Sequence, residues 1–538
     1  MYNNNSSTSS DSSNSEEKAN AQHASSTDST SEHTDPAVAD EGFPAEQYQS
    51  ADLEKQQLLI EEGPGGFPYI TNPERFYVSL EPSDPRLAVN WPTHVKILHV
   101  ALLAFTTLTA SWGSSVFSAA ATIFAAKYHI GLTVALLGMS LYVCGFASGP
   151  ILWAPISELV GRKIPLIVGM FMFSIFSIAV AVAKDVQTVM ICRFFSGFCA
   201  SSPLSVVAAA FADMFDNKTR GPAVCIFACI TFAGPLIGPI AGGFLAKSYL
   251  GWRWTEYITS FMGFFSTLCL LFMKECYSRT ITEQEAARLR VEYNNNFIRA
   301  KSEEEYIDFK ALAKRYLAVP FVLLFCEPIV FLLTLYMSFV YGILYLLLEA
   351  YPIIFAEKRH FSLGVDALPY IGLLVGVILG AALIAYFQGY YNRKLDANGG
   401  KPVPEARLPP MMIGSVLFPA GIFWLAWSGY YTHVHWIVPT LSGLLTGCGI
   451  LTIFMQSLIY LIDAYLFRAA SVIAANTIMR SLVAAGFPLF AVQMFHNMGI
   501  GWAGSLLGFI ATALIPIPTL FFIFGKRIRL MSKNTVNL

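Results

Sequence analysis

We single out five of the ionisable residues that lie within or at the ends of long apolar stretches of this sequence, where a charge is costly. Two are arginines and three are acids: Arg193, Arg480, Glu327, Glu349 and Asp463. A charged side chain in an apolar, membrane-like environment needs a partner, water or a function. A carboxyl group in such a place can change its protonation with its surroundings, and an arginine can stabilise the charged form. These five residues are therefore the candidates for proton coupling, with the three acids as possible proton carriers and the two arginines as their possible partners.

A second group of candidates is aromatic or mildly polar and lies in four of the apolar stretches. Aromatic faces attract cations, so these residues could line a cavity for planar amphipathic ligands. The alternative is ordinary packing, because Trp and Tyr are also common at membrane interfaces. The candidate cavity residues are Trp112, Ser115, Phe194, Phe195, Tyr336, Tyr341, Tyr345, Gln456 and Tyr460.

Patterns for several other kinds of chemistry do not occur in the sequence. The nine cysteines are spread singly, without CxxC pairs or Cys/His clusters of zinc spacing, so we expect no bound metal. We find no phosphate-binding Walker loop and no recognisable catalytic triad. The net charge of −1 gives no support to a nucleic-acid partner. We therefore expect a protein that is not an enzyme and that needs no cofactor.

The elements that position the candidate residues are membrane helices. The sequence is 55% hydrophobic and only 13% charged, with a mean hydropathy of +0.53, whereas a soluble protein carries about 25% charged residues. A helical span needs about 20 predominantly apolar residues. We identify twelve such stretches, centred on residues 97–118, 133–153, 164–183, 188–212, 221–246, 253–273, 326–348, 367–389, 408–428, 436–460, 469–494 and 502–524.

A long polar interruption after the sixth stretch divides the chain into two halves of six spans. Lys and Arg concentrate in the loops on the side of this interruption, which places both termini in the cytosol. The start of the chain is rich in Ser and Asn and poor in apolar residues, as is typical of disorder. The expected parts are a disordered cytosolic tail (1–80), an N-terminal six-helix bundle (95–273), a central cytosolic loop (274–318), a C-terminal six-helix bundle (319–525) and a cytosolic tail (526–538).

The loop after the second span reads SGPILWAPISELVGRKIP and contains Glu158, Gly161, Arg162 and Lys163. Gly161 permits a tight turn, and the two basic residues anchor the start of the third span. Glu158 could pair with Arg162 or cap a helix of the other half. Such contacts would form a cytosolic latch between the halves. Plain anchoring by positive charge is the alternative.

The fifth span contains the stretch GPLIGPIAGG, with Gly234, Gly238, Pro239, Gly242 and Gly243. Glycines spaced by four residues line one face of a helix and let another helix approach closely. The proline removes one backbone donor and bends the helix. We expect this face to form the seam between the two halves, where it could seal against proton leak.

These motifs carry a resemblance to a known family. The loop motif resembles the G-x-L-x-D-x-x-G-R-K signature of the major facilitator superfamily, with Glu158 at the acid position and Ala154 in place of the first Gly. Arg193 with Gly197 resembles the R-x-x-x-G signature of drug:proton antiporters, and GPLIGPIAGG resembles their G-x-x-x-G-P-x-x-G-G signature. The stretches EPSDPRLAVNWP and GWRWTEY are similar to those of fungal members. The resemblance covers essentially the whole chain after the tail.

The resemblance implies an all-α membrane protein with the major facilitator fold, in which two bundles rock around a central site. It implies proton-coupled export of amphipathic drugs or xenobiotics by alternating access across a fungal plasma membrane, with Arg193 taking part in coupling. Export of polyamines or other organic cations is the alternative, and a ligand sensor that does not transport is a third hypothesis. The expected partners are a small-molecule substrate, protons and the lipid bilayer, and we expect a monomer.

Overall fold

The computed structural model describes residues 69–72, 77–216, 220–295, 298–303, 318–399, 403–465 and 468–531. The tail predicted for residues 1–80 lies outside the described residues, apart from 69–72 and 77–80. The same is true of residues 304–317 in the predicted central loop and of 532–538 at the end of the chain. The fold described below belongs to the unit Leu58–Leu538.

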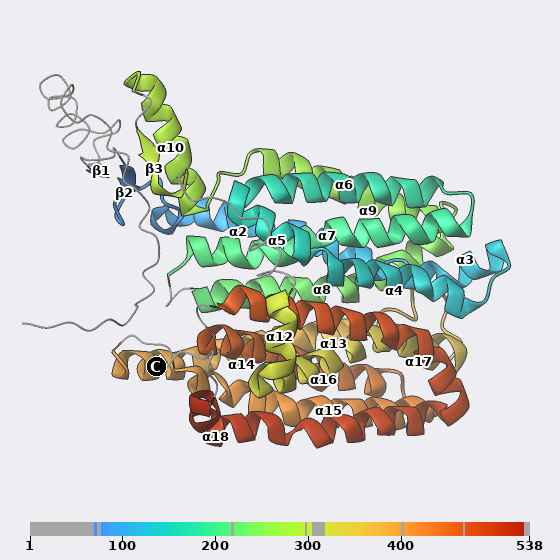
Figure 1. Cartoon of the computed structure of the whole chain (residues 1–538). Helices are drawn as coiled ribbons and strands as arrows, with labels where there is room; N and C mark the ends of the chain where they lie inside the picture. The colour runs from blue at the N-terminus through green and yellow to red at the C-terminus, as the bar shows by residue number, and fades with distance from the viewer. Residues whose placement is uncertain are drawn as a thin grey trace, which may run out of the picture. The chain divides into compact units, whose positions relative to one another are not determined.

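This unit consists of two bundles of helices that run roughly side by side (Figure 1). The N-terminal bundle contains α2 (Thr93–Ser115), α3 (Ala121–Tyr128), α4 (Leu132–Ser148), α5 (Pro150–Val160), α6 (Lys163–Val182), α7 (Val186–Met214), α8 (Arg220–Lys247) and α9 (Arg253–Leu271). The C-terminal bundle contains α12 (Val319–Cys326), α13 (Pro328–Pro352), α14 (Tyr370–Ala397), α15 (Pro409–Tyr430), α16 (Ile437–Ala464), α17 (Ala469–Leu514) and α18 (Pro516–Met531). Short helical turns join them at η2 (Ala88–Asn90), η3 (Ser118–Ala120), η4 (Lys301–Glu303), η6 (Ile353–Glu357) and η7 (Pro404–Arg407).

Each of the twelve predicted stretches coincides with helix. Within the described residues, nine segments are long and apolar enough to cross a membrane, or ten when the bent pair α4 and α5 counts as one. The segment Ser471–Leu530 holds two spans, because the backbone at Gly499 leaves helical geometry (φ 77°, ψ 157°) and the chain turns back (Figure 1). Helix α9 is 19 residues long, but Thr255, Glu256 and Thr259 make it less apolar. The predicted all-α membrane fold is confirmed.

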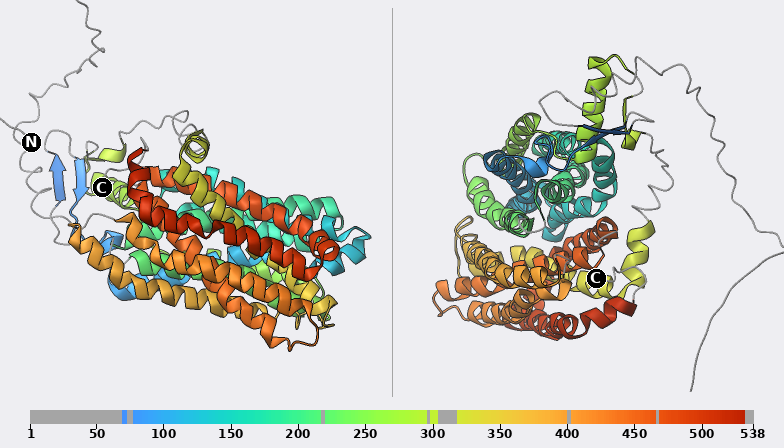
Figure 2. Two further views of the ribbon diagram at one scale, coloured as in Figure 1. Left: turned by 90° about the horizontal axis from the view of Figure 1, so that it is seen from below. Right: turned by 90° about the vertical axis from the view of Figure 1, so that its left-hand side faces the viewer.

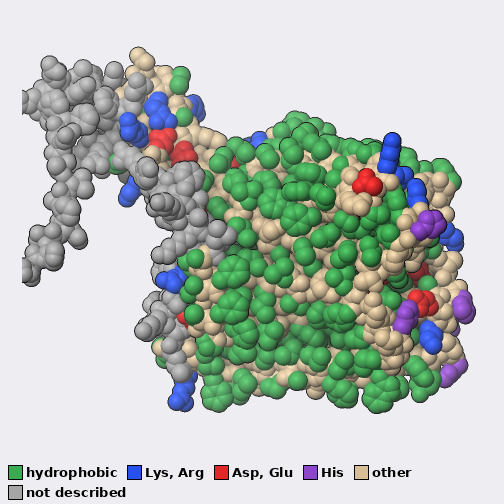
Figure 3. Space-filling model, turned by 45° about the vertical axis from the view of Figure 1, so that its right-hand side comes forward, with side chains coloured by type: hydrophobic (Ala, Val, Ile, Leu, Met, Phe, Trp, Pro, Cys, Tyr) green, Lys and Arg blue, Asp and Glu red, His purple; other side chains and the backbone are tan. Residues whose placement is uncertain are grey.

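The surface of the bundles is suited to lipid. Figure 3 shows hydrophobic side chains across the middle of one face, with charged side chains gathered toward its two ends. Large apolar side chains from several helices are more than half exposed, among them Phe265 (56%), Ile378 (57%) and Phe509 (61%). An apolar band between polar ends matches the thickness profile of a bilayer. The end of the bundles that holds helix α10 is called the α10 end below, and the opposite one the far end.

A small second core lies at the α10 end. Helix α10 (Ser278–Glu292) packs beside a three-stranded sheet of β1 (Tyr69–Asn72), β2 (Tyr77–Leu80) and β3 (Arg299–Ala300). Strands β1 and β2 pair antiparallel, and β2 and β3 pair parallel. The buried side chains are Val78, Ala286, Leu289, Ile298 and Ala300. The central loop is thus joined to the segment before α2.

The two bundles meet mainly along two helix pairs, α4 with α17 and α8 with α14. The end-on view in Figure 2 shows the bundles as two adjoining groups. At the far end, Gln493 of α17 donates to Thr133 of α4 (2.9 Å), and a Cβ placed on Gly243 of α8 would lie 2.7 Å from the Cα of Gly364. The bundles are therefore in contact at the far end.

Candidate functional site

Arg193 of α7 forms an ion pair in the interior of the N-terminal bundle. Its Nη2 lies 3.0 Å from Oε1 of Glu256 in α9, and both side chains are 1% exposed. Nη1 donates to the carbonyl oxygen of Gly113 in α2 (2.8 Å). The guanidinium also lies over the rings of Phe117 and Tyr142, at 4.4 and 5.5 Å from their centres. Arg193 is therefore fully buried and paired, and it does not extend toward the surface.

The last turn of α2 connects this pair with the second bundle. One turn along α9 from Glu256, Thr259 accepts a hydrogen bond from Nε1 of Trp112 (3.0 Å). Ser114 of α2 accepts a hydrogen bond from the hydroxyl of Tyr345 in α13 (2.9 Å). Because α2 contacts both partners within one turn, a change at the ion pair has a short physical path to the bundle interface.

Aromatic side chains from both bundles meet at that interface. The ring of Tyr341 in α13 lies 5.2 Å from Tyr345, 6.0 Å from Phe232 of α8 and 6.2 Å from Phe454 of α16. The guanidinium of Arg480 in α17 lies over Tyr341 at 4.5 Å from the ring centre. Of the predicted cavity residues, Tyr341 and Tyr345 are thus brought together between the bundles.

Three predicted cavity residues of the N-terminal bundle lie elsewhere. Phe195 is 43% exposed and stacks on Phe176 of α6, and Phe194 is half-buried beside it. The cavity prediction is wrong for Phe195, because α7 turns this side chain toward the outer surface while Arg193 faces inward. Ser115 is buried and donates to the carbonyl oxygen of Trp112 (3.4 Å) in the packing of α2.

The remaining cavity candidates belong to the C-terminal bundle. Tyr336 is buried, and its hydroxyl has no hydrogen-bond partner among the described residues. Gln456 is buried with an unbonded side-chain oxygen and lines a small pocket with Arg407 of η7 at the α10 end. Tyr460 packs against Phe521 of α18, with ring centres 5.9 Å apart, so it lies within the C-terminal bundle.

The three candidate acids differ in their surroundings, although all are buried. Asp463 pairs with Arg407 at 3.5 Å, and Glu327 accepts a hydrogen bond from the hydroxyl of Tyr465 (3.1 Å). Both contacts join segments at the α10 end of the C-terminal bundle. Glu349 lies toward the far end of α13, and its Oε1 has no hydrogen-bond partner in the described part of the chain.

The glycine motif of α8 packs in a different place from the one predicted. A Cβ on Gly234 would lie 2.8 Å from backbone atoms of α2, and one on Gly242 would lie 2.7 Å from the carbonyl oxygen of Val116. Gly238 also faces α2, against Ser115. The predicted seam between the bundles is therefore wrong for these three glycines, which face a helix of their own bundle. Gly243 alone of the four meets the second bundle.

The physical reason is that α8 has two packed faces. Phe232 and the two ends of α8 face the second bundle, whereas the glycine face accommodates α2. The helix continues through Pro235 and Pro239, and both prolines are buried. Small residues spaced by four predict that another backbone comes close, but they do not identify its bundle.

The predicted latch residues form contacts within the N-terminal half. Arg162 pairs with Asp213 of α7 (2.9 Å) and not with Glu158 as one prediction had it. The backbone N–H groups of Arg162 and Lys163 donate to the carboxylate of Glu275 (2.9 and 3.0 Å). These partners belong to the N-terminal bundle or to the segment directly after it. The contacts therefore anchor the start of α6, and a latch between the bundles remains a prediction.

The turn before α6 depends on Gly161. Its backbone has φ 96° and ψ 176°, a region that disfavours side chains, which agrees with the tight turn expected there. A Cβ would also lie 2.6 Å from the carboxylate of Glu275. The glycine therefore leaves room for the acid that binds the first N–H groups of α6.

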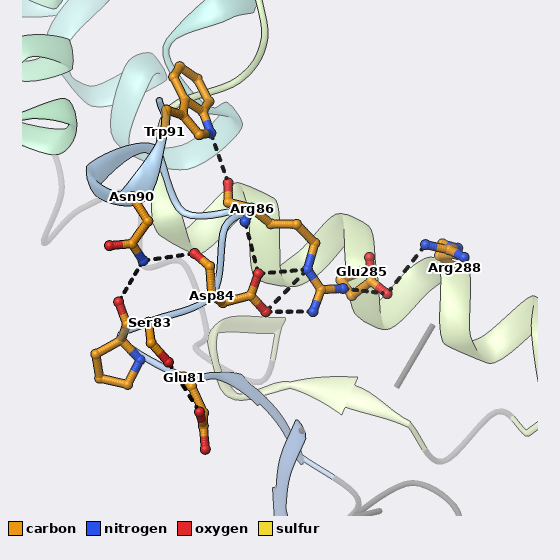
Figure 4. A network of polar contacts seen from close by, with 9 residues as sticks. Glu81, Ser83, Asp84, Arg86, Asn90, Trp91, Glu285 and Arg288 are labelled. Atoms are coloured by element: carbon orange, nitrogen blue, oxygen red, sulfur yellow. Dashed lines mark hydrogen bonds and ion pairs between the residues drawn. The ribbon is translucent and has the colours of Figure 1, made fainter. Parts of the chain in front are cut away.

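A polar network at the α10 end ties the segment before α2 to the central loop (Figure 4). Asp84 accepts hydrogen bonds from the backbone N–H of Arg86 (2.8 Å) and from its guanidinium (2.6 Å). Nη1 of Arg86 lies 3.0 Å from Oε1 of Glu285 in α10. Asn90 and Trp91 donate to backbone carbonyls of the same turn (2.8 and 3.3 Å). The segment EPSDPRLAVNWP is therefore a compact turn that binds α10.

Replacing Arg86 by alanine is expected to loosen α10 while the bundles stay folded. The substitution removes the 3.0 Å ion pair of Arg86 with Glu285, whose side chain is 9% exposed, and a hydrogen bond to a charged group is worth about 1.5–3 kcal/mol. Amide hydrogen exchange over Ser278–Glu292 should become faster. The control is Arg288→Ala, since Arg288 is 55% exposed and 3.8 Å from the same acid. Equal exchange in both variants would contradict this role for Arg86.

The same network should respond to acid. Burial alone would raise the pKa of Asp84, but its hydrogen bonds with Arg86 and the charge of Arg86 bring this pKa below the ordinary value. A lowered folded-state pKa stabilises the contact above the unfolded-state pKa, and this stability is lost as pH falls through the folded value. The rate of amide hydrogen exchange in α10, corrected for the intrinsic effect of pH, should therefore stay constant near neutral pH and rise only below about pH 4. A loss of protection already near about pH 6 would point to another titrating group.

Several residues of the site were not predicted from the sequence. They are Asp213, Phe232, Glu256, Glu275 and Phe454. A signal existed for Glu256, which is an acid inside the sixth predicted span and lies in the quoted motif GWRWTEY. Its partner Arg193 comes from another helix, and no spacing rule connects two residues so far apart in the sequence.

Comparisons with known proteins agree with this architecture. The profile of the Major Facilitator Superfamily matches residues 103–488. An uncharacterized transporter of Schizosaccharomyces pombe is 63% identical over 472 residues, which cover 88% of this chain and 82% of the relative. A multidrug transporter of Candida glabrata is 44% identical over 87% of this chain and 82% of its own length. A multidrug transporter of Candida albicans is 45% identical over 84% of this chain and 75% of its own length. The chain belongs to the major facilitator superfamily of membrane transporters.

Proposed function

We propose that this protein exports amphipathic drugs and other xenobiotics across the plasma membrane, driven by a proton gradient. Two relatives named multidrug transporters, at 44% and 45% identity, support the substrate class. Proton coupling and antiport are supported by one observation above all, the ion pair of Arg193 with Glu256. An ionisable pair enclosed in a membrane bundle is retained at a cost, which favours a functional role.

The contacts of the pair suggest how a proton could alter the fold. A proton on Glu256 would neutralise its carboxylate and leave Arg193 with the carbonyl of Gly113 as its polar contact. The attraction between α7 and α9 would weaken, and α2 contacts both. Since α2 also binds the second bundle through Ser114, protonation would favour a different placement of the bundles. A ligand can shift such an equilibrium only by binding the two states differently.

Efflux from cells and from proteoliposomes tests the function. Cells that overexpress the protein should retain less of a neutral fluorescent drug, and a protonophore should remove the difference. In proteoliposomes, an imposed pH gradient should drive accumulation of the drug, and reversing the gradient should reverse it. Drug efflux that changes neither with the protonophore nor with the pH gradient would refute proton coupling. The absence of any drug flux would refute export.

The variant Glu256→Gln is expected to lose gradient-driven transport. Glutamine keeps the size of the side chain but cannot release a proton, so the pH gradient should no longer drive accumulation. Downhill exchange of drug is expected to persist if the protein is folded. The comparison is Glu349→Gln, which removes a buried acid of the C-terminal bundle whose Oε1 has no hydrogen-bond partner among the described residues. Coupling lost in Glu349→Gln and kept in Glu256→Gln would place the proton site in the C-terminal bundle.

A further inference from the structure

The second buried arginine, Arg480 of α17, differs from Arg193 in having no acidic partner. Its side chain is buried, with a residue exposure of 7%. Within the described residues no carboxylate lies within ion-pair distance of it, and its Nε is enclosed without an acceptor. Its contacts are the rings of Tyr341 and Phe454, whose centres lie 4.5 and 4.9 Å from the guanidinium carbon.

The contrast with Arg193 is informative because both arginines lie inside membrane helices of one chain. Arg193 has a glutamate and a backbone carbonyl as acceptors. Arg480 has two aromatic faces. Aromatic faces attract a cation, but they do not supply the anionic partner that a buried charge ordinarily needs. The charge of Arg480 is therefore under-compensated by the residues around it.

Arg480 lies against an aromatic cluster to which both bundles contribute. Tyr341 and Phe454 lie near the middles of α13 and α16, and both contact Phe232 of α8 from the N-terminal bundle, at 6.0 and 5.0 Å. Tyr345, one turn after Tyr341, binds Ser114 of α2. Substrate sites of transporters with two related halves lie near the midplane between them.

We propose that Arg480 is the anion-binding group of a central substrate site, and that the site takes organic anions with an aromatic body. A guanidinium binds a carboxylate or sulfonate through two parallel N–H donors. The rings of Tyr341, Phe454 and Phe232 provide the apolar contact for the rest of such a molecule. This proposal rests on the proposed export function and narrows its substrate class.

The same arrangement disfavours polyamines at this position. A polycation would meet the positive charge of Arg480 in an apolar surrounding, where like charges repel strongly. Aromatic rings could bind a cation, but two of the nearest rings already face the guanidinium. Neutral amphipathic drugs remain compatible with the site, because they need only the aromatic contacts.

A matched series of ligands tests the charge preference on the intact protein. Purified full-length protein in nanodiscs is titrated with 2-naphthoate, 2-naphthamide and 2-naphthylmethylamine, which share one ring system and differ in charge. We expect naphthoate to bind at least about tenfold more tightly than the amine, the size of one charge-assisted contact. A wild-type protein that binds naphthoate no more tightly than the amine overturns the proposal.

Variants of Arg480 locate the effect. Arg480→Gln should weaken naphthoate binding by about tenfold or more and change naphthamide binding little, and Arg480→Lys should keep part of the preference. Arg393→Gln is the control for the loss of an arginine, since Arg393 is exposed on α14. Unchanged naphthoate binding in Arg480→Gln would overturn the proposal. If Arg480→Gln fails to fold, the ligand affinities of the wild-type protein and of Arg480→Lys test the proposal.

A separate measurement distinguishes this proposal from the export function. Flux of the neutral naphthamide in proteoliposomes reports whether the protein transports at all. Flux of naphthamide without a preference for naphthoate would reject the anion site and keep the export function. The absence of flux for every compound, with naphthoate still bound selectively, would reject export and keep the anion site.

Discussion

Substituting leucine for Gly234 is expected to leave little folded transporter in the membrane. A Cβ at this position would already lie 2.8 Å from the backbone of α2 at Ser111 and Trp112, and backbone cannot move aside as a flexible side chain can. Leucine adds three further carbons in the same direction. Ordinary overpacking costs about 1–3 kcal/mol, and separating α2 from α8 along the motif should cost more. The measurement is the amount of monodisperse protein after mild solubilisation and its unfolding temperature.

The matched control is leucine at Gly389, a glycine of α14 that is exposed and at which an added Cβ would meet, outside its own stretch of helix, no atom of the described residues within 4 Å. The substitution is the same in chemistry and also lies in a helix, so it separates loss of close packing from loss of a glycine. We expect Gly389→Leu to express and unfold like the natural protein. Near-normal stability of Gly234→Leu would show that α2 and α8 do not approach as closely as described.

The glycine motif shows what a sequence pattern can and cannot predict. The four-residue spacing correctly indicated a close helix contact in the fifth span, because only small residues permit such an approach. The partner was predicted wrongly, because α8 lies between α2 and α14 and the pattern carries no information on direction. Helix positions were predicted more completely, since apolar length alone determines them. The same rule predicted α9, although it carries Thr255, Glu256 and Thr259 and is less apolar than the other spans.

For the buried charged residues, the sequence identified several of the positions but not their partners. Burial in an apolar stretch correctly marked Arg193 and Arg480 as residues that need an explanation. It did not separate Asp463, which is held by Arg407, from Glu349, for which the described residues provide no cation. Glu256 was not selected at all, because its partner Arg193 lies on another helix and the sequence does not show that the two side chains meet. Partners of buried charges are fixed by the crossing of helices, and that crossing is a property of the packed bundle.

The ion pair of Arg193 with Glu256 is expected to show a large coupling energy in a double-mutant cycle. Arg193→Gln leaves a buried glutamate without its cation, and Glu256→Gln leaves a buried arginine with one carbonyl contact. Removing one partner of a buried pair costs about 3–5 kcal/mol, whereas replacing both is often nearly neutral. Each single variant should therefore unfold at a clearly lower temperature, and the double variant should recover much of the loss. Gradient-driven transport should not recover, because neither glutamine of the double variant can bind and release a proton.

The cycle needs an exposed pair for comparison, and α10 offers Arg288 with Glu292, at 3.7 Å and with side-chain exposures of 55% and 43%. A pair of this kind, one helical turn apart, contributes only about 0.3–0.5 kcal/mol. If burial makes the Arg193–Glu256 pair strong, the coupling energy of its cycle should be several-fold larger than that of the Arg288–Glu292 cycle. Single variants of Arg193 and Glu256 that are no less stable than those of Arg288 would mean that water reaches the pair. A double variant that regains stability but not gradient-driven transport would separate the packing role of the pair from its role in proton coupling. The two neutral side chains can restore the packing, but they cannot bind and release a proton.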